Sequence, residues 1–132
     1  MLPTKELLAL RIVFGDIVLF VGNMTKGTYV GEFEQLILLA VLRLGEGAYG
    51  VGIRDEIVER TERSITRGAL YAGLDRLEEK GLLKSRLGEP TAERGGRAKR
   101  FYELTGSGEL ALSTSLRSVK RMTQGLRVPF PG

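Results

Sequence analysis

Residues 64–108 constrain the fold of this 132-residue chain more than any other stretch. They contain a helical pattern with an arginine at its start, the apolar pair Leu82-Leu83, a basic Gly-Gly loop and the aromatic pair Phe101-Tyr102. This order predicts a helix, a strand, a long loop and a second strand. A short helix beside a hairpin with a charged tip is typical of a winged helix-turn-helix, whose helix enters a DNA groove.

Two helical patterns precede this stretch. Apolar residues recur at 3.6-residue spacing over 31–44, and Gly45-Glu46-Gly47 ends that helix. A second helix is expected over about 50–60, with Ile53 and Ile57 on its inner face. The third helix begins at a cap, Ser64 or Thr66, and runs to about residue 80.

The rest of the chain predicts a hairpin and a last helix. Strands are expected over 82–87 and 100–104, with Phe101 and Tyr102 on opposite faces, and residues 88–99 form the wing loop between them. Thr105 caps the last helix. The fold class is therefore mainly α with a small β-hairpin (α+β). We expect a winged helix-turn-helix over 31–104, a C-terminal dimerisation helix over 105–126 and a tail over 127–132.

Residues 1–30 differ from the rest. Their apolar run is interrupted by Arg11, Gly15 and Asp16, and the remaining pieces are far shorter than the ~20 residues that span a bilayer. A signal peptide would need a cleaner apolar core and a cleavage site. We expect an N-terminal extension that is disordered or not native, because Met24 is an alternative start and would leave residues 1–23 outside the native chain.

The net charge of +4 is distributed unevenly. Residues 31–63 hold four basic and seven acidic side chains, whereas residues 80–104 hold seven basic and three acidic ones. The segment from Thr105 adds four basic side chains against one acidic. This asymmetry indicates a basic face directed at a polyanion.

The chain contains no cysteine and no histidine. Disulfides, thiolate or imidazole metal sites and Ser-His-Asp catalysis are therefore excluded. The carboxylates of Glu56 and Glu59 lie on a charged helix face and suggest solvated surface rather than an acid–base pair. We expect no enzyme activity, no metal and no cofactor, and a cytoplasmic protein without a membrane contact.

The predicted DNA-contacting residues of the third helix lie near its start. Arg67 is suited to guanine O6 and N7 or to a phosphate, and Thr66 is a base reader or only the cap. The small Gly68, Ala69, Ala72 and Gly73 would let the backbone approach DNA closely. Tyr71, like Tyr49, is either a contact residue or a packing residue with its hydroxyl at the surface. The predicted set is Ser64, Thr66, Arg67, Gly68, Ala69 and Tyr71.

The wing loop has the densest group of cationic residues in the chain. Its glycines would allow close approach while its cations contact phosphates or a minor groove. The alternative is a solubilising hairpin tip. The predicted wing contacts are Arg94, Gly95, Gly96, Arg97, Lys99 and Arg100.

The last helix carries an apolar seam of Leu112, Leu116, Val119 and Leu126, spaced by 4, 3 and 7 residues. The seam belongs either to the chain's own core or to a dimer surface. Dimerisation is favoured, because three other helices already cover the core of a winged helix of this size.

Three strings together resemble the PadR-like winged-helix transcriptional regulators: GEFEQLILLAVLRLGEGAYGVGI, ITRGALYAGLDRLEEKGLLKSRL and RGGRAKRFYELTGSGELAL, within residues 31–124. The resemblance implies a homodimeric repressor that binds palindromic double-stranded DNA through the third helix and the wing. It also implies dimerisation through the last helix packed with the first. The chain departs from many relatives in lacking a longer C-terminal helical domain and in having Ala72 where they have proline.

The sequence alone therefore leaves two possible functions. The first is a DNA-binding repressor, with an apolar cavity at the dimer interface as the place for an unidentified small hydrophobic effector. The second is a winged helix that binds an acidic protein through its basic wing, without specific DNA binding. Steep salt dependence on duplex DNA would distinguish them.

Overall fold

The computed structural model describes residues 29–89 and 98–127. The predicted N-terminal extension up to residue 28, the centre of the wing loop and the tail from residue 128 lie outside this part. The elements follow the predicted order. They are α3 (Glu32–Leu44), the 3₁₀ turn η1 (Gly45–Gly47), α4 (Gly50–Thr61), α5 (Arg67–Glu79), β1 (Leu83–Leu87), β2 (Arg100–Leu104) and α6 (Gly106–Thr123).

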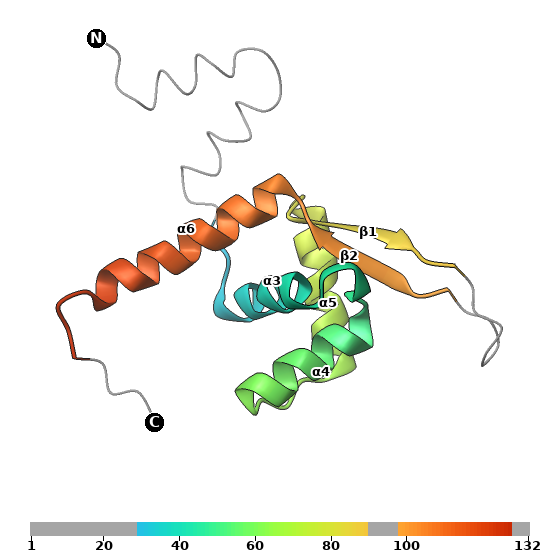
Figure 1. Cartoon of the computed structure of the whole chain (residues 1–132), viewed down its shortest axis with the longest axis horizontal. Helices are drawn as coiled ribbons and strands as arrows, with labels where there is room; N and C mark the ends of the chain where they lie inside the picture. The colour runs from blue at the N-terminus through green and yellow to red at the C-terminus, as the bar shows by residue number, and fades with distance from the viewer. Residues whose placement is uncertain (1–28, 90–97, 128–132) are drawn as a thin grey trace, which may run out of the picture.

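Helices α3, α4 and α5 pack around one apolar core (Figure 1). Each sequence pattern supplies residues to this core, including Ile37 of α3, Ile53 of α4 and Leu74 of α5, all 0% exposed. Val30 also lies in this core, one residue ahead of the predicted start of the domain. The core thus depends on the segment that leads into α3 as well as on the helices.

The hairpin closes one side of the core. β1 and β2 are antiparallel, with Leu83 opposite Leu104 and Ser85 opposite Tyr102. Tyr102 and Leu104 are buried, whereas Phe101 is half-buried on the other face, as strand alternation requires. The Tyr102 N–H donates to the Ala48 carbonyl at 2.8 Å, so residues before α4 join the edge of the hairpin.

The ends of α5 and α6 follow ordinary capping chemistry. Gly81 has a φ of +75°, which lets the chain turn from α5 into β1. The Thr105 hydroxyl accepts from the Gly108 N–H at 3.0 Å and caps α6. α6 ends at Thr123, so Leu126 lies beyond the helix that we predicted to reach it.

α6 has two different halves. Its first part packs against α3 and buries Ala111, Leu112 and Ser115, whereas its second part extends beyond the other helices (Figure 1). The hairpin extends from the opposite side of the molecule. Two elements therefore project from the helical body, one at each end.

Candidate nucleic-acid interface

The first turn of α5 is exposed and carries one cation. Arg67, Gly68 and Ala69 are all exposed, and a Cβ added at Gly68 would meet nothing within 4 Å. No ion pair within the described residues includes Arg67. This turn therefore offers a cation and a bare stretch of backbone to a large ligand.

Thr66 is the cap of α5, because its hydroxyl accepts from the Ala69 N–H at 3.1 Å. Ser64 is exposed in the connection between the helices and makes no cap. The neighbouring Ile65 is buried, and the Arg54 Nε donates to its carbonyl at 2.7 Å. The connection that leads into Thr66 and Arg67 is therefore hydrogen-bonded to α4.

Tyr71 has a packing role. Its side chain is 42% exposed, yet its ring lies against the start of α4, where a Cβ added at Gly50 would stand 2.4 Å from the phenol oxygen. Tyr71 therefore fixes the contact between the two helices while one side of it faces solvent.

One prediction about the small residues of α5 is wrong. Gly73 is buried, and a Cβ added there would lie 2.6 Å from Ile37 Cδ1 and 3.3 Å from Phe33 Cε2. Its small size serves the packing of α5 on α3 and not an approach to DNA. Ala72 is exposed.

At the end of the hairpin next to the wing loop, two cations lie over aromatic rings. The Lys99 ammonium lies 4.3 Å from the centre of the Tyr49 ring, and the Arg86 guanidinium lies 4.9 Å from that of Phe101. The two rings meet edge to face at 6.1 Å. Cation–π contacts hold these charges close to the protein surface without neutralising them. The predicted wing set lacks Arg86 and Tyr49, because contacts between segments distant in the sequence leave no local signal.

Arg100 begins a polar chain that links the hairpin to α5. Its Nη1 donates to the Ser85 hydroxyl at 3.0 Å, and that hydroxyl donates to Glu78 Oε2 at 2.7 Å. Burial raises the pKa of the Tyr102 phenol above its ordinary value, and the Glu78 carboxylate adds to this shift. Arg94, Gly95, Gly96 and Arg97 lie outside the described residues.

The cations of α3, of α4 and of the connection after α4 are paired with carboxylates. Glu56 binds both Arg60 and Arg43, the second at 3.1 Å, and Arg63 pairs with Glu32. The Arg60 guanidinium, with help from Arg43, holds the pKa of Glu56 below its usual value. On the hairpin Lys84 pairs with Glu103, but no ion pair of the described chain includes Lys99 or Arg100.

The predicted seam of α6 is divided between core and surface. Leu112 is 4% exposed and packs in the chain's own core, so its assignment to a contact surface is wrong. Leu116 is 39% exposed and Val119 57%, and Leu126 is exposed beyond the helix. The predicted seam does not include Met122, which is 78% exposed, because Met122 does not fall on the alternating spacing of four and three residues that defines the seam.

A groove of about 560 Å³ lies between the end of α3 and the outer face of the hairpin. Its walls include Leu42 and Phe101, but also the charged side chains of Glu46, Lys84 and Arg86. A cavity for a hydrophobic effector would be mostly apolar. We therefore do not assign such an effector to this groove.

Within residues 29–89 and 98–127, no three acidic side chains gather in a way that could hold a metal ion. In the same part of the chain, no helix has the length and apolar character needed to cross a membrane.

A family described as transcriptional regulator PadR-like matches residues 38–114. No curated protein matches the sequence. Among solved structures, a PadR-like transcription factor from Bacteroides fragilis is 29% identical, with 70% of this chain and 84% of that chain covered and a TM-score of 0.58. A transcriptional regulator from Clostridium thermocellum is 26% identical over 69% and 82% of the two chains, with a TM-score of 0.57. A PadR family regulator from Clostridium difficile, 23% identical over 69% and 94%, shares the fold with a TM-score of 0.52.

Proposed function

Because this chain belongs to the PadR-like family of transcriptional regulators, which bind DNA, we propose that it is a repressor that binds palindromic operator DNA as a homodimer. The family and the similar structures are regulators of transcription and not enzymes. A repressor of this kind would act in the cytoplasm, where the DNA of a bacterium or archaeon lies.

One observation carries the proposal: among the described residues, Arg67 of the exposed first turn of α5 and the hairpin cations Lys99 and Arg100 take part in no ion pair. Arg67 would reach the bases or the backbone of the major groove, with Gly68 and Ala69 allowing close approach. Lys99 and Arg100 would contact phosphates beside it. Arg94 and Arg97 complete the proposed wing contact.

The outer half of α6 supports the homodimer. Leu116, Val119 and Met122 leave large apolar side chains in water, and a two-fold contact with a second copy would bury them. Such a contact would place two α5 helices about one DNA turn apart, ~34 Å. A small hydrophobic effector, if one regulates the repressor, would bind between the two subunits.

The test is binding of the full chain to duplex DNA, first selected from random sequences and then measured by fluorescence anisotropy. The proposal expects a palindromic selected sequence, bound about a thousandfold more tightly than a scrambled duplex of the same composition. Affinity should fall steeply with salt. Equal, weak affinity for both duplexes would instead favour a winged helix that binds an acidic protein.

A further inference from the structure

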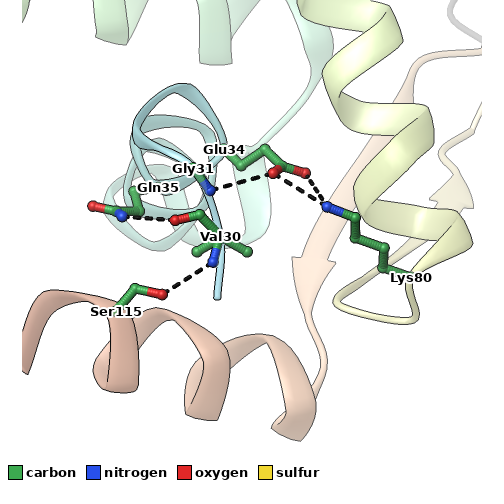
Figure 2. Close-up of polar contacts among 6 residues, drawn as sticks. All are labelled: Val30, Gly31, Glu34, Gln35, Lys80 and Ser115. Atoms are coloured by element: carbon green, nitrogen blue, oxygen red, sulfur yellow. Dashed lines mark hydrogen bonds and ion pairs between the residues drawn. The ribbon is translucent and has the colours of Figure 1, made fainter. Parts of the chain in front are cut away.

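Val30 and Gly31, the two residues that lead into α3, are hydrogen-bonded to side chains of α6 and α3, and Glu34 of α3 links them to Lys80 at the end of α5 (Figure 2). We call this pair the Val30–Gly31 joint. Each backbone N–H of the joint donates to a side chain: that of Val30 to Ser115, and that of Gly31 to Glu34. The joint therefore lies where α6, α3 and α5 can be connected.

The connection to α6 is a buried hydrogen bond. The Val30 N–H donates to Ser115 Oγ at 3.1 Å, across 85 residues of sequence, and the two residues are 4% and 3% exposed. Ser113 and Ser118 of α6 instead donate to carbonyls of their own helix. Of the residues that the structure describes, Ser115 is the one polar residue that is buried. Its loss would leave the Val30 N–H buried without a partner, which is unfavourable.

The connection to α3 holds the other side of Val30. The Gln35 Nε2 donates to the Val30 carbonyl at 2.8 Å. Both backbone polar groups of Val30 are thus bound by side chains from two helices, and Val30 cannot shift relative to α6 without breaking one of these bonds.

The connection to α5 runs through Glu34. Glu34 Oε1 accepts from the Gly31 N–H at 3.4 Å, and Lys80 Nζ donates to both carboxylate oxygens, at 3.2 and 2.9 Å. Lys80 is the C-cap of α5. The Glu34 side chain is only 12% exposed, so water screens this pair less than the exposed pair between Lys84 and Glu103.

We propose that the Val30–Gly31 joint sets the position of α5 relative to α6, and that Ser115, Glu34 and Lys80 are positioning residues for DNA binding. The inference rests on the proposed function, in which α6 makes the dimer contact and α5 contacts DNA. The distance between the two α5 helices of a dimer depends on the angle between α5 and α6 within each subunit. The joint therefore helps to determine which separation of operator half-sites the protein accepts.

The experiment uses the full chain and duplexes derived from the sequence selected by wild type. One duplex carries a single half-site, and the others carry two half-sites whose separation is changed by one base pair at a time. Wild type should prefer one separation. Lys80→Gln and Ser115→Ala should each reduce that preference about fivefold, a typical coupling between sites, and leave affinity for the single half-site unchanged.

The double variant tests whether the two connections act in series. If they do, Lys80→Gln with Ser115→Ala should lose no more of the separation preference than either single variant, whereas independent effects would multiply. Ser113→Ala and Glu103→Gln are matched controls, because they remove a serine bond within α6 and an exposed ion pair on the hairpin. Both controls should keep the wild-type preference.

Each outcome has a separate meaning. If wild type binds no duplex specifically or prefers no separation, the proposed function fails. If wild type has a preference and Lys80→Gln keeps it, or if single half-site affinity falls equally, the joint does not position α5. A multiplied loss in the double variant also overturns the inference. Lys80 is exposed, so Lys80→Gln should fold. This variant therefore tests whether the joint positions α5 even if Ser115→Ala unfolds.

Discussion

Gly108 of α6 lies directly against the carbonyl oxygen of Leu82: a Cβ built on Gly108 would stand 2.0 Å from that oxygen. The same short segment receives two hydrogen bonds from Thr105, whose N–H donates to the Leu82 carbonyl at 3.1 Å and whose hydroxyl donates to the Gly81 carbonyl at 2.6 Å. The first turn of α6 is therefore fixed to the connection between α5 and β1, backbone against backbone.

Gly108→Ala should destabilise the protein by about 3 kcal/mol, because the new methyl group meets a backbone atom that cannot rotate away. Gly106→Ala, in the same turn, is the matched control, because a Cβ there meets nothing within 4 Å. It should be neutral or stabilising by up to about 1 kcal/mol. Urea unfolding followed by circular dichroism measures both. Equal stability of the two variants would contradict the contact.

Arg67→Ala should weaken binding to the selected operator by about 1–3 kcal/mol and relax the preference at one base pair of each half-site, because a guanidinium that reads a base is lost. Arg117→Ala removes the same charge from α6 and should leave that preference intact. Competition assays with operator and random duplexes measure the effect. An equal loss on both duplexes would assign Arg67 to phosphate contact and leave specificity to DNA shape.

Arg97→Ala should weaken binding to all duplexes similarly, because a phosphate contact carries no sequence information. The slope of log affinity against log salt should flatten by about 1. Lys120→Ala, an equal loss of charge on α6, should leave the slope unchanged. Titrations at several salt concentrations provide the slope. A loss confined to one operator would mean that Arg97 reads bases.

Leu116→Asp should give a monomer that keeps its helical circular dichroism and binds the operator weakly, because the charge disrupts only the proposed contact between copies. Leu112→Asp places the same charge in the chain's own core, where Leu112 is 4% exposed, and should unfold the protein. Sedimentation and circular dichroism separate the two results. The dimer model is wrong if wild type is monomeric at micromolar concentration.

Glu56 should make stability depend on pH in the acidic range. Its pKa is below 4.5 in the folded chain because Arg60 and Arg43 bind the carboxylate. A lowered folded-state pKa contributes stability above the unfolded value of 4.5, and this contribution is lost as the pH falls below it. The difference in unfolding free energy between wild type and Glu56→Gln should therefore shrink on acidification. Arg60→Gln should reduce the same difference at neutral pH; a difference independent of pH would refute the assignment.

The sequence predicts the elements well because each has a local signal. Apolar spacing identifies the inner faces of α3, α4 and α5, and Thr66 and Thr105 have the chemistry of caps. Spacing does not show what an apolar face packs against, which is why the sequence pattern wrongly places Leu112 on a dimer surface. The prediction for Gly73 is wrong for a related reason, because a small residue suits close packing and close approach to a ligand equally.

Contacts between distant segments leave no local signal at all. The bond between Ser115 and Val30 depends on how α6 crosses α3, which is decided by packing in three dimensions. The same holds for Lys99 over the ring of Tyr49. Both contacts follow from the three-dimensional fold and from no pattern in the sequence around these residues.

The bond from Tyr102 to the Ala48 carbonyl has a consequence for the order of folding. A two-stranded hairpin alone is at best marginally stable in water. In this hairpin, β2 is also hydrogen-bonded to Ala48, which precedes both α4 and α5. The bond therefore closes a chain loop that contains the whole helix-turn-helix. Closing such a loop is entropically unfavourable until the helices have shortened it. We therefore expect the helices to collapse first and the hairpin to form late, with amide exchange slowing at Tyr102 only after α4 and α5 are protected.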